Sequence, residues 1–287
     1  MGRGAAARNV AKCWVAVALP TTGLAWLGYL AGGLPAAVTS AACVIFIAAG
    51  IYAYGDRALL GMVGARELLE AEAPQVRSTL TTLASRAGIP VPKLYLLPDG
   101  YPRLLVVGRG GQGGAAVAVS TGLLTAANPS ELEGLLAHEI ALIRRRDVMV
   151  QTAAALLSSA IVELSRIGGF ARNAFLVILG PIGASLTHLL LSPRRTLTAD
   201  RDAARLCDSP HGLADALLRL EAAQGMVAFA ASPATEPLYA ISPFAPDRLS
   251  AMFSTHPPTA ERITRLRALD PEWRDRLHAA LSDDASA

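Results

Sequence analysis

Two long apolar runs stand near the beginning of the chain. They extend from about Cys13 to Leu30 and from about Ala36 to Tyr54, and a short stretch containing Gly32, Gly33 and Pro35 separates them. About 18 consecutive apolar residues are enough to cross a bilayer core of roughly 30 Å. The pattern predicts a transmembrane hairpin rather than a cleaved signal peptide, because the second run follows at once.

Two later apolar segments, from Val148 to Leu164 and from Ala174 to Leu191, are shorter and more polar. They fit either membrane spans or buried helices of a soluble domain, and we favour spans. If the four segments span the membrane, most of the short stretches flanking them on one side carry arginine or lysine. Such residues favour the cytoplasmic side, so the soluble parts are predicted to be cytoplasmic. These basic flanking residues are Arg3, Arg8, Lys12, Arg57, Arg144, Arg145, Arg146, Arg194 and Arg195.

The remaining segments alternate between helical and strand patterns. Residues 66–87 have helical periodicity, and Gly88 and Pro90 end it. Asn128 can cap a helix, with Pro129 and Glu131 suited to its first and third positions. Strands are predicted at 93–97, 104–107 and 115–120, further helices at 196–207, 212–224 and from Pro258, and a loop at 228–255.

The predicted organisation has five parts. They are a transmembrane hairpin (1–55), a cytoplasmic part with the His-Glu helix (56–147), a second hairpin (148–191), a cytoplasmic helical part (192–280) and a disordered tail (281–287). His256, just before the last helix, is interpreted as a packing or capping residue.

The composition agrees with a membrane protein. Hydrophobic residues make up 52% of the 287, mean hydropathy is +0.39 and only 17% are charged, against about 25% in soluble domains. A net charge of +3 without aromatic residues among the basic ones argues against nucleic-acid binding. The three scattered cysteines form neither a disulfide framework nor a metal knuckle.

The most informative segment runs from Glu131 to Asp147 and contains the pair His138-Glu139. In zinc hydrolases with an HExxH motif, two histidines four residues apart share a helical face and bind the metal. The glutamate is then the general base. Here Leu142 stands four residues after His138, so spacing alone favours a structural role for the pair.

Several motifs keep a common order along nearly the whole chain: residues 86–93, 116–124, 131–147, 195–204 and 253–262, with the early membrane hairpin. Together they resemble the HtpX family, membrane zinc metalloproteases of bacterial protein quality control. The resemblance implies an α+β, mainly α-helical fold. The expected fold is a zincin-like metalloprotease domain with a small β-sheet and four transmembrane helices in two hairpins. The cofactor of the family is zinc.

The resemblance also implies a site that this chain keeps only in part. His138 matches the first zinc ligand and Glu139 the general base, but Leu142 occupies the second ligand position. Thr196 stands where the family has a ligating glutamate, and Asp200 matches the aspartate that follows it. Asp200 is expected either to hydrogen-bond His138, as an orienting residue would, or to pair with an arginine.

The family's strand beside the substrate corresponds to residues 103–109. Leu105, Val106, Gly108 and Arg109 are therefore the candidate substrate-edge residues, although the family's asparagine and phenylalanine are missing.

These replacements decide the predicted chemistry. A catalytic zinc needs three protein ligands and a water, whereas leucine cannot coordinate and a threonine hydroxyl is a poor substitute for a carboxylate. Asp200 lies one turn beyond Thr196, about 6 Å along a helix, too far to replace it. Zinc is therefore not expected here, and Glu139 is interpreted as a remnant base.

The predicted function is that of an inactive homologue, a pseudoprotease that binds peptides or proteins, or regulates, at the plasma membrane. The expected partners are the bilayer, peptide or membrane-protein clients and an active paralogue. Two alternatives stay open. One is an active metalloendopeptidase with substitute ligands, such as His138 with Asp200 or Asp202, and the other is a membrane scaffold without peptide binding.

Overall fold

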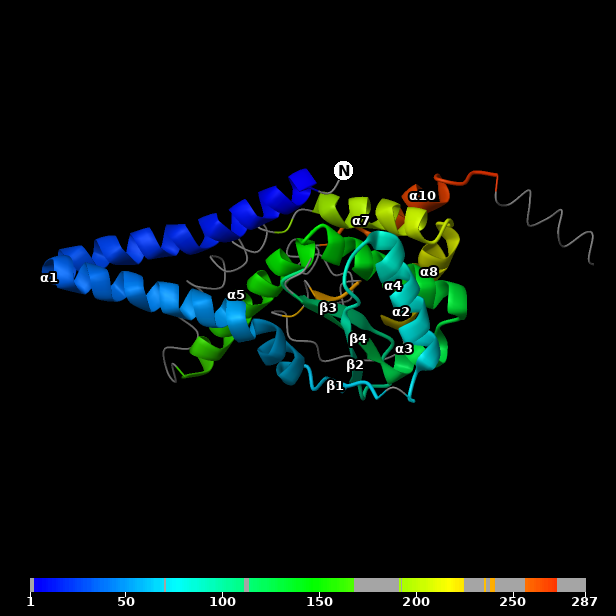
Figure 1. The fold of residues 1–287 in the computed structure, drawn as a ribbon, viewed down its shortest axis with the longest axis horizontal. Helices are drawn as coiled ribbons and strands as arrows, with labels where there is room; N and C mark the ends of the chain where they lie inside the picture. The colour runs from blue at the N-terminus through cyan, green and yellow to red at the C-terminus, as the bar shows by residue number, and fades with distance from the viewer. Residues whose placement is uncertain are drawn as a thin grey trace, which may run out of the picture.

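The computed structural model describes residues 3–69, 71–110, 114–167, 191, 193–224, 235, 238–240 and 256–272. Within these residues the fold is mainly helical with one small four-stranded sheet, as predicted. Figure 1 shows a long helical hairpin projecting from a body that contains the sheet and the remaining helices.

The projecting hairpin is helix α1, which runs from Arg3 to Met62 and is kinked at Gly32 and Gly33. Gly33 has a φ of 68°, a conformation that glycine adopts most readily, so the chain reverses where the sequence predicts. The Ser40 hydroxyl donates to the Leu24 carbonyl at 3.1 Å, which joins the two arms. Within the described residues, Thr21–Met62 is the one helix long and apolar enough to cross a membrane, with a mean hydropathy of 2.1.

The third candidate span lies in helix α5, from Asp147 to Ile167. Its first half is buried and contacts α1 and the sheet. The Thr152 hydroxyl there accepts a hydrogen bond from the Gly108 amide at 2.9 Å, so this half of α5 belongs to the core of the body. The fourth candidate, 174–191, lies almost entirely outside the described residues, and the second hairpin stays a prediction.

The sheet confirms the three predicted strands and adds one. Strands β1 (Arg66–Glu67), β2 (Lys93–Leu97), β3 (Leu104–Gly108) and β4 (Ala115–Ser120) lie in the order β1-β2-β4-β3. The β2–β4 pair is parallel, and the β1–β2 and β3–β4 pairs are antiparallel. The sheet is therefore mixed, with β3 at one edge.

The prediction of a helix over residues 66–87 is wrong in its first third. Helix α2 runs only from Pro74 to Ala87, while the Leu68 amide donates to the Leu94 carbonyl beside the β1–β2 pair. Pro74 lacks an amide hydrogen and suits the first turn of a helix. Leu68 is apolar because it is buried beside the sheet, not because it lies on a helical stripe.

Helix α4, from Pro129 to Arg144, is the centre of the body. Asn128 and Glu131 form the predicted capping box at its start. α4 contacts α2, α7 (Pro193–Leu206) and α8 (His211–Gln224). A short helix that was not predicted, α3 (Thr121–Ala126), follows β4. The last described helix, α10 (Thr259–Arg267), contacts α7 and α8. Gly134 lets α4 approach α8 closely, because a Cβ there would meet the Leu213 backbone.

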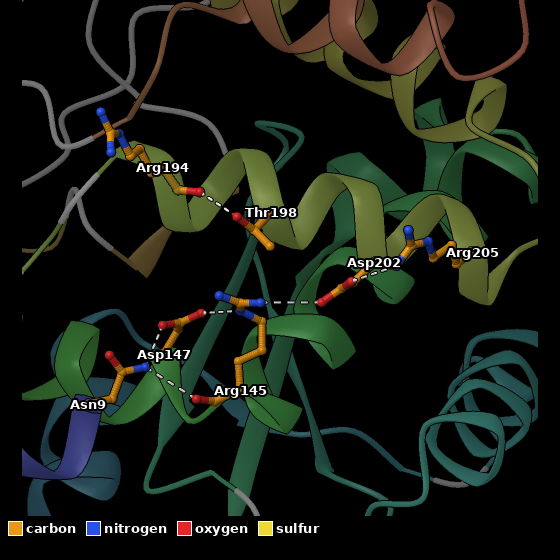
Figure 2. A network of polar contacts seen from close by, with 7 residues as sticks. All are labelled: Asn9, Arg145, Asp147, Arg194, Thr198, Asp202 and Arg205. Carbon is orange, nitrogen blue, oxygen red and sulfur yellow. Dashed lines mark hydrogen bonds and ion pairs between the residues drawn. The ribbon is translucent and has the colours of Figure 1, made fainter. Parts of the chain in front are cut away.

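A polar network fixes the first arm of α1 to the end of α4 (Figure 2). The Asn9 side-chain amide donates to the Asp147 carboxylate at 2.6 Å and to the Arg145 carbonyl at 3.2 Å. The Arg145 guanidinium in turn donates to Asp147 at 3.0 Å. Asn9 and Asp147 are buried, so the base of the hairpin has a defined position on the body.

Candidate functional site

The candidate site lies in the middle of α4, where His138 and Glu139 are 2% and 0% exposed. Helix α7 crosses α4 there and brings Asp200 to His138, with 2.8 Å between Asp200 Oδ1 and His138 Nδ1. The two groups are close but not aligned for a regular hydrogen bond. Asp200 therefore lies against the His138 ring, and its role as an orienting residue stays a prediction.

Asp200 pairs with an arginine, which was the second of the two sequence-based alternatives. The Arg262 guanidinium, on α10, donates through Nε and Nη2 to the two Asp200 oxygens, each at 2.8 Å. Arg262 is 1% exposed, and its Nη1 donates to the Ala240 carbonyl at 2.6 Å. Sequence reasoning gave Arg262 no role. One signal for its role was present in the sequence: Arg262 stands next to Ile263 on the apolar face of an amphipathic helix. A cation buried there needs a partner of opposite charge.

The surroundings set the charges of this cluster. Burial would raise the pKa of Asp200, but Arg262 and then His138 hold that pKa well below its usual range, so the carboxylate is ionised. Burial lowers the pKa of His138, and Asp200 opposes this only in part. The ring is therefore neutral at pH 7, and the charged pair is Asp200 with Arg262 rather than Asp200 with His138.

Leu142 and Thr196, which the sequence resemblance assigns to the other two ligand positions, are both 3% exposed. Leu142 lies one turn after His138 in the hydrophobic core, and Thr196 lies one turn before Asp200 on α7. Within the described residues, no three histidine, cysteine, aspartate or glutamate side chains are grouped to hold a metal ion. A hydrocarbon and a hydroxyl at these positions do not fit a zinc ion.

Asp202, the substitute ligand considered above, is directed elsewhere. Figure 2 shows its carboxylate directed toward Arg145 and Arg205, with N···O distances of 3.5 and 3.9 Å. Asp200, in turn, is engaged by Arg262 at both oxygens. This arrangement argues against a ligand set built from His138 and these two aspartates.

Glu139 is a buried carboxyl group whose two oxygens have no hydrogen-bond partner among the described residues. Burial raises its pKa to about 8, against the opposing effect of Arg262 and Arg195. The group is therefore mostly protonated at pH 7, unlike a carboxylate base. Because the pKa is higher in the folded chain than the ordinary 4.5, the folded state binds the proton more tightly, and stability falls as pH rises from about 4.5 to about 8.

We expect Glu139→Gln to remove this pH dependence. The wild-type chain should lose on the order of 3 kcal/mol of stability between pH 4.5 and pH 7 through this group, and the glutamine variant should not. Thermal unfolding of the detergent-solubilised protein, followed over pH 5 to 8.5, measures the difference. Equal slopes in the two proteins would show that Glu139 is not a buried neutral acid.

The candidate substrate-edge residues lie on or next to β3. Leu105 and Val106 are fully buried, and the Gly108 amide is bound by Thr152. The Arg109 guanidinium lies 5.2 Å from the ring centre of Tyr52 in α1, within cation–π distance. The strand is thus at the sheet edge, but its side chains are buried.

His256 contacts the backbone of Tyr239. Its Nε2 lies 2.9 Å from the Tyr239 carbonyl oxygen, whereas the residue at the N-cap of α10 is Pro258, which makes no side-chain cap. Beyond its contact with Tyr239, whether His256 packs or caps stays a prediction.

The sequence of this chain matches a known protein family and several of its members. Residues 70–270 match Peptidase family M48, whose members are generally zinc-dependent. A Protease HtpX homolog from Pelotomaculum thermopropionicum is 34% identical over 91% of this chain and 99% of its own length. One from Thermococcus kodakarensis is 37% identical over 90% and 95%.

A solved structure supports the same fold. The crystal structure of Ste24p from S. mikatae superposes with a TM-score of 0.51 at 18% identity, and the match covers 88% of this chain and 63% of that one. At this identity the likeness concerns the fold alone. The family and sequence matches, which span most of the chain, show that the chain belongs to peptidase family M48.

Proposed function

We propose that this chain is a catalytically inactive member of its family, a membrane-bound protein that binds peptides or regulates rather than cleaves. The observation that carries the proposal is the composition of the buried site. His138 is the single matching ligand, Leu142 and Thr196 are buried at the other two positions, and Arg262 supplies the cation next to Asp200. One imidazole cannot hold a catalytic zinc.

The membrane part of the proposal rests on α1. Several large apolar side chains along both arms are exposed, among them Trp26 (62%), Leu30 (66%) and Phe46 (81%). Such a surface is unfavourable in water and favourable in lipid. We place the chain in the plasma membrane with its body on the cytoplasmic side, following the basic flanks.

Metal analysis of the purified full-length protein tests the inactivity. We expect far less than one zinc per chain after overnight incubation with zinc and gel filtration, and no cleavage of casein. The matched control is His138→Ala, which should have the same metal content as the wild type. Zinc bound at one per chain and lost in His138→Ala would overturn the proposal, and zinc-dependent cleavage would support the active alternative.

A further inference from the structure

The outer edge of β3 is covered by the chain itself. Tyr239 forms an antiparallel bridge with Leu105, and the Ala240 amide donates to the Leu104 carbonyl at 3.2 Å. Further along, Thr152 engages the Gly108 amide. An uncovered edge strand presents unpaired amides and carbonyls that pair with extended peptides. The segment Leu238–Ala240, here called the strap, occupies that position.

The strap is also held by two side chains from the C-terminal part of the chain. Arg262 donates to the Ala240 carbonyl at 2.6 Å, and His256 Nε2 lies 2.9 Å from the Tyr239 carbonyl oxygen. The other donors of Arg262 bind Asp200, which contacts His138. The strap thus lies between the sheet edge and the buried cluster on α4 and α7.

The strap consists of buried apolar residues, as a bound peptide would, and its backbone pairing with the sheet is short. Its three side chains, Leu238, Tyr239 and Ala240, are at most 4% exposed, and Leu238 and Tyr239 pack in one apolar cluster with Leu105 and Val107. The Tyr239 hydroxyl also accepts a hydrogen bond from Arg103, next to β3, at 3.2 Å. The backbone of the strap meets β3 through an isolated bridge, whereas β3 and β4 pair along five residues. Short pairings of this kind open at lower free energy than the core of a sheet.

We propose that the strap is an internal occupant of a peptide-docking edge, so that this chain is autoinhibited for peptide binding. The ligand that it excludes is an extended apolar peptide running antiparallel to β3. His256 and Arg262 keep the strap closed, and its release exposes the edge. This inference rests on the peptide-binding half of the proposed function and not on the absence of zinc.

A disulfide tests the placement of the strap. In a background with Cys13, Cys43 and Cys207 replaced by alanine, Leu105→Cys and Tyr239→Cys are combined. These positions form a non-hydrogen-bonded antiparallel pair, because the Ala240–Leu104 bond flanks them. Such pairs have Cα atoms about 4.5 Å apart, within the range of disulfides. Mild oxidation should cross-link the folded protein, and failure to cross-link would overturn the proposal.

Peptide binding tests the inhibition. The probe is a fluorescein-labelled peptide with the sequence of residues 237–242, Pro-Leu-Tyr-Ala-Ile-Ser, measured by anisotropy with full-length protein in detergent. We expect weak binding to the wild type and about tenfold tighter binding to His256→Ala, which loses one contact to the strap. His211→Ala, which removes a histidine paired with Asp270 on another surface, is the matched control and should behave as the wild type.

The two tests combine in one protein. With His256→Ala added to the cysteine pair, oxidation should abolish peptide binding and a reducing agent should restore it. Amide hydrogen exchange of the unsubstituted wild type is a check that needs no variant. The amides of Leu104 and Val106, which point toward the outer edge of β3, should be protected, and their protection should fall in His256→Ala. Peptide binding that is equal in wild type, His256→Ala and the cross-linked protein would overturn the proposal, whatever the zinc content.

Discussion

Replacing Arg262 with methionine is expected to lower the free energy of unfolding by about 3–5 kcal/mol, the range for breaking a buried ion pair from one side. The arginine is 1% exposed and binds both oxygens of Asp200. Without it, an ionised carboxylate stays buried beside a neutral imidazole, and the Ala240 carbonyl loses a donor. Chemical denaturation of the detergent-solubilised protein measures the change.

Arg265→Met is the matched control, because Arg265 lies on the same helix and pairs with Glu261 at the surface, with 58% and 41% of the two side chains exposed. A surface pair of this kind contributes little, so this variant should unfold almost as the wild type does. The double variant Arg262→Met/Asp200→Asn should recover part of the loss, since no charge is then left unpaired. Equal destabilisation by Arg262→Met and Arg265→Met would contradict the buried pair.

Local signals allowed much of the fold to be predicted. The capping box at Asn128 and Glu131 and the bounds of the strands at 93–97 and 115–120 agree with the structure. Each depends on neighbouring residues, whose propensities and alternation can be read in a short window. The reversal at Gly33 belongs to the same class, because a left-handed backbone position selects glycine.

Contacts between distant segments could not be read in the same way. Arg262 and Asp200 are 62 positions apart, and nothing in either local pattern specifies the other. The strap lies in a segment rich in proline and serine that was predicted to be a loop, yet Tyr239 pairs with β3. Residues 66–67 were predicted to be helical because Leu68 fitted an apolar stripe, and tertiary pairing with β2 overrides that preference.

The grouping of residues around His138 could be anticipated from the sequence, but the electrostatics of the group could not. The family resemblance directed attention to His138, Leu142, Thr196 and Asp200, and the structure buries all four where α4 and α7 meet. That Arg262 provides the positive charge beside Asp200 emerges only in three dimensions. The buried negative charge of Asp200 is thus balanced by the guanidinium of Arg262.

The double variant Leu142→His/Thr196→Glu should regain zinc binding, from none to about one ion per chain. An imidazole one turn after His138 and a carboxylate one turn before Asp200 would complete a three-ligand set on two helices that already pack together. The metal-free variant should be less stable than the wild type, because two polar groups enter a buried site. Zinc should reverse this loss, with about 2.7 kcal/mol gained at a free zinc concentration 100 times the Kd.

Zinc binding is to be measured by elemental analysis and by competition with a chromophoric chelator, with the same substitutions in a His138→Ala background as the control. Binding that persists without His138 would mean that the new ligands form a site elsewhere, and a folded double variant without zinc would mean that α4 and α7 do not hold these positions together. Proteolysis is not expected to return with the metal. The strap still covers β3 through Tyr239 and Ala240, so a restored metal site would have no access to an extended chain until His256→Ala loosens that cover.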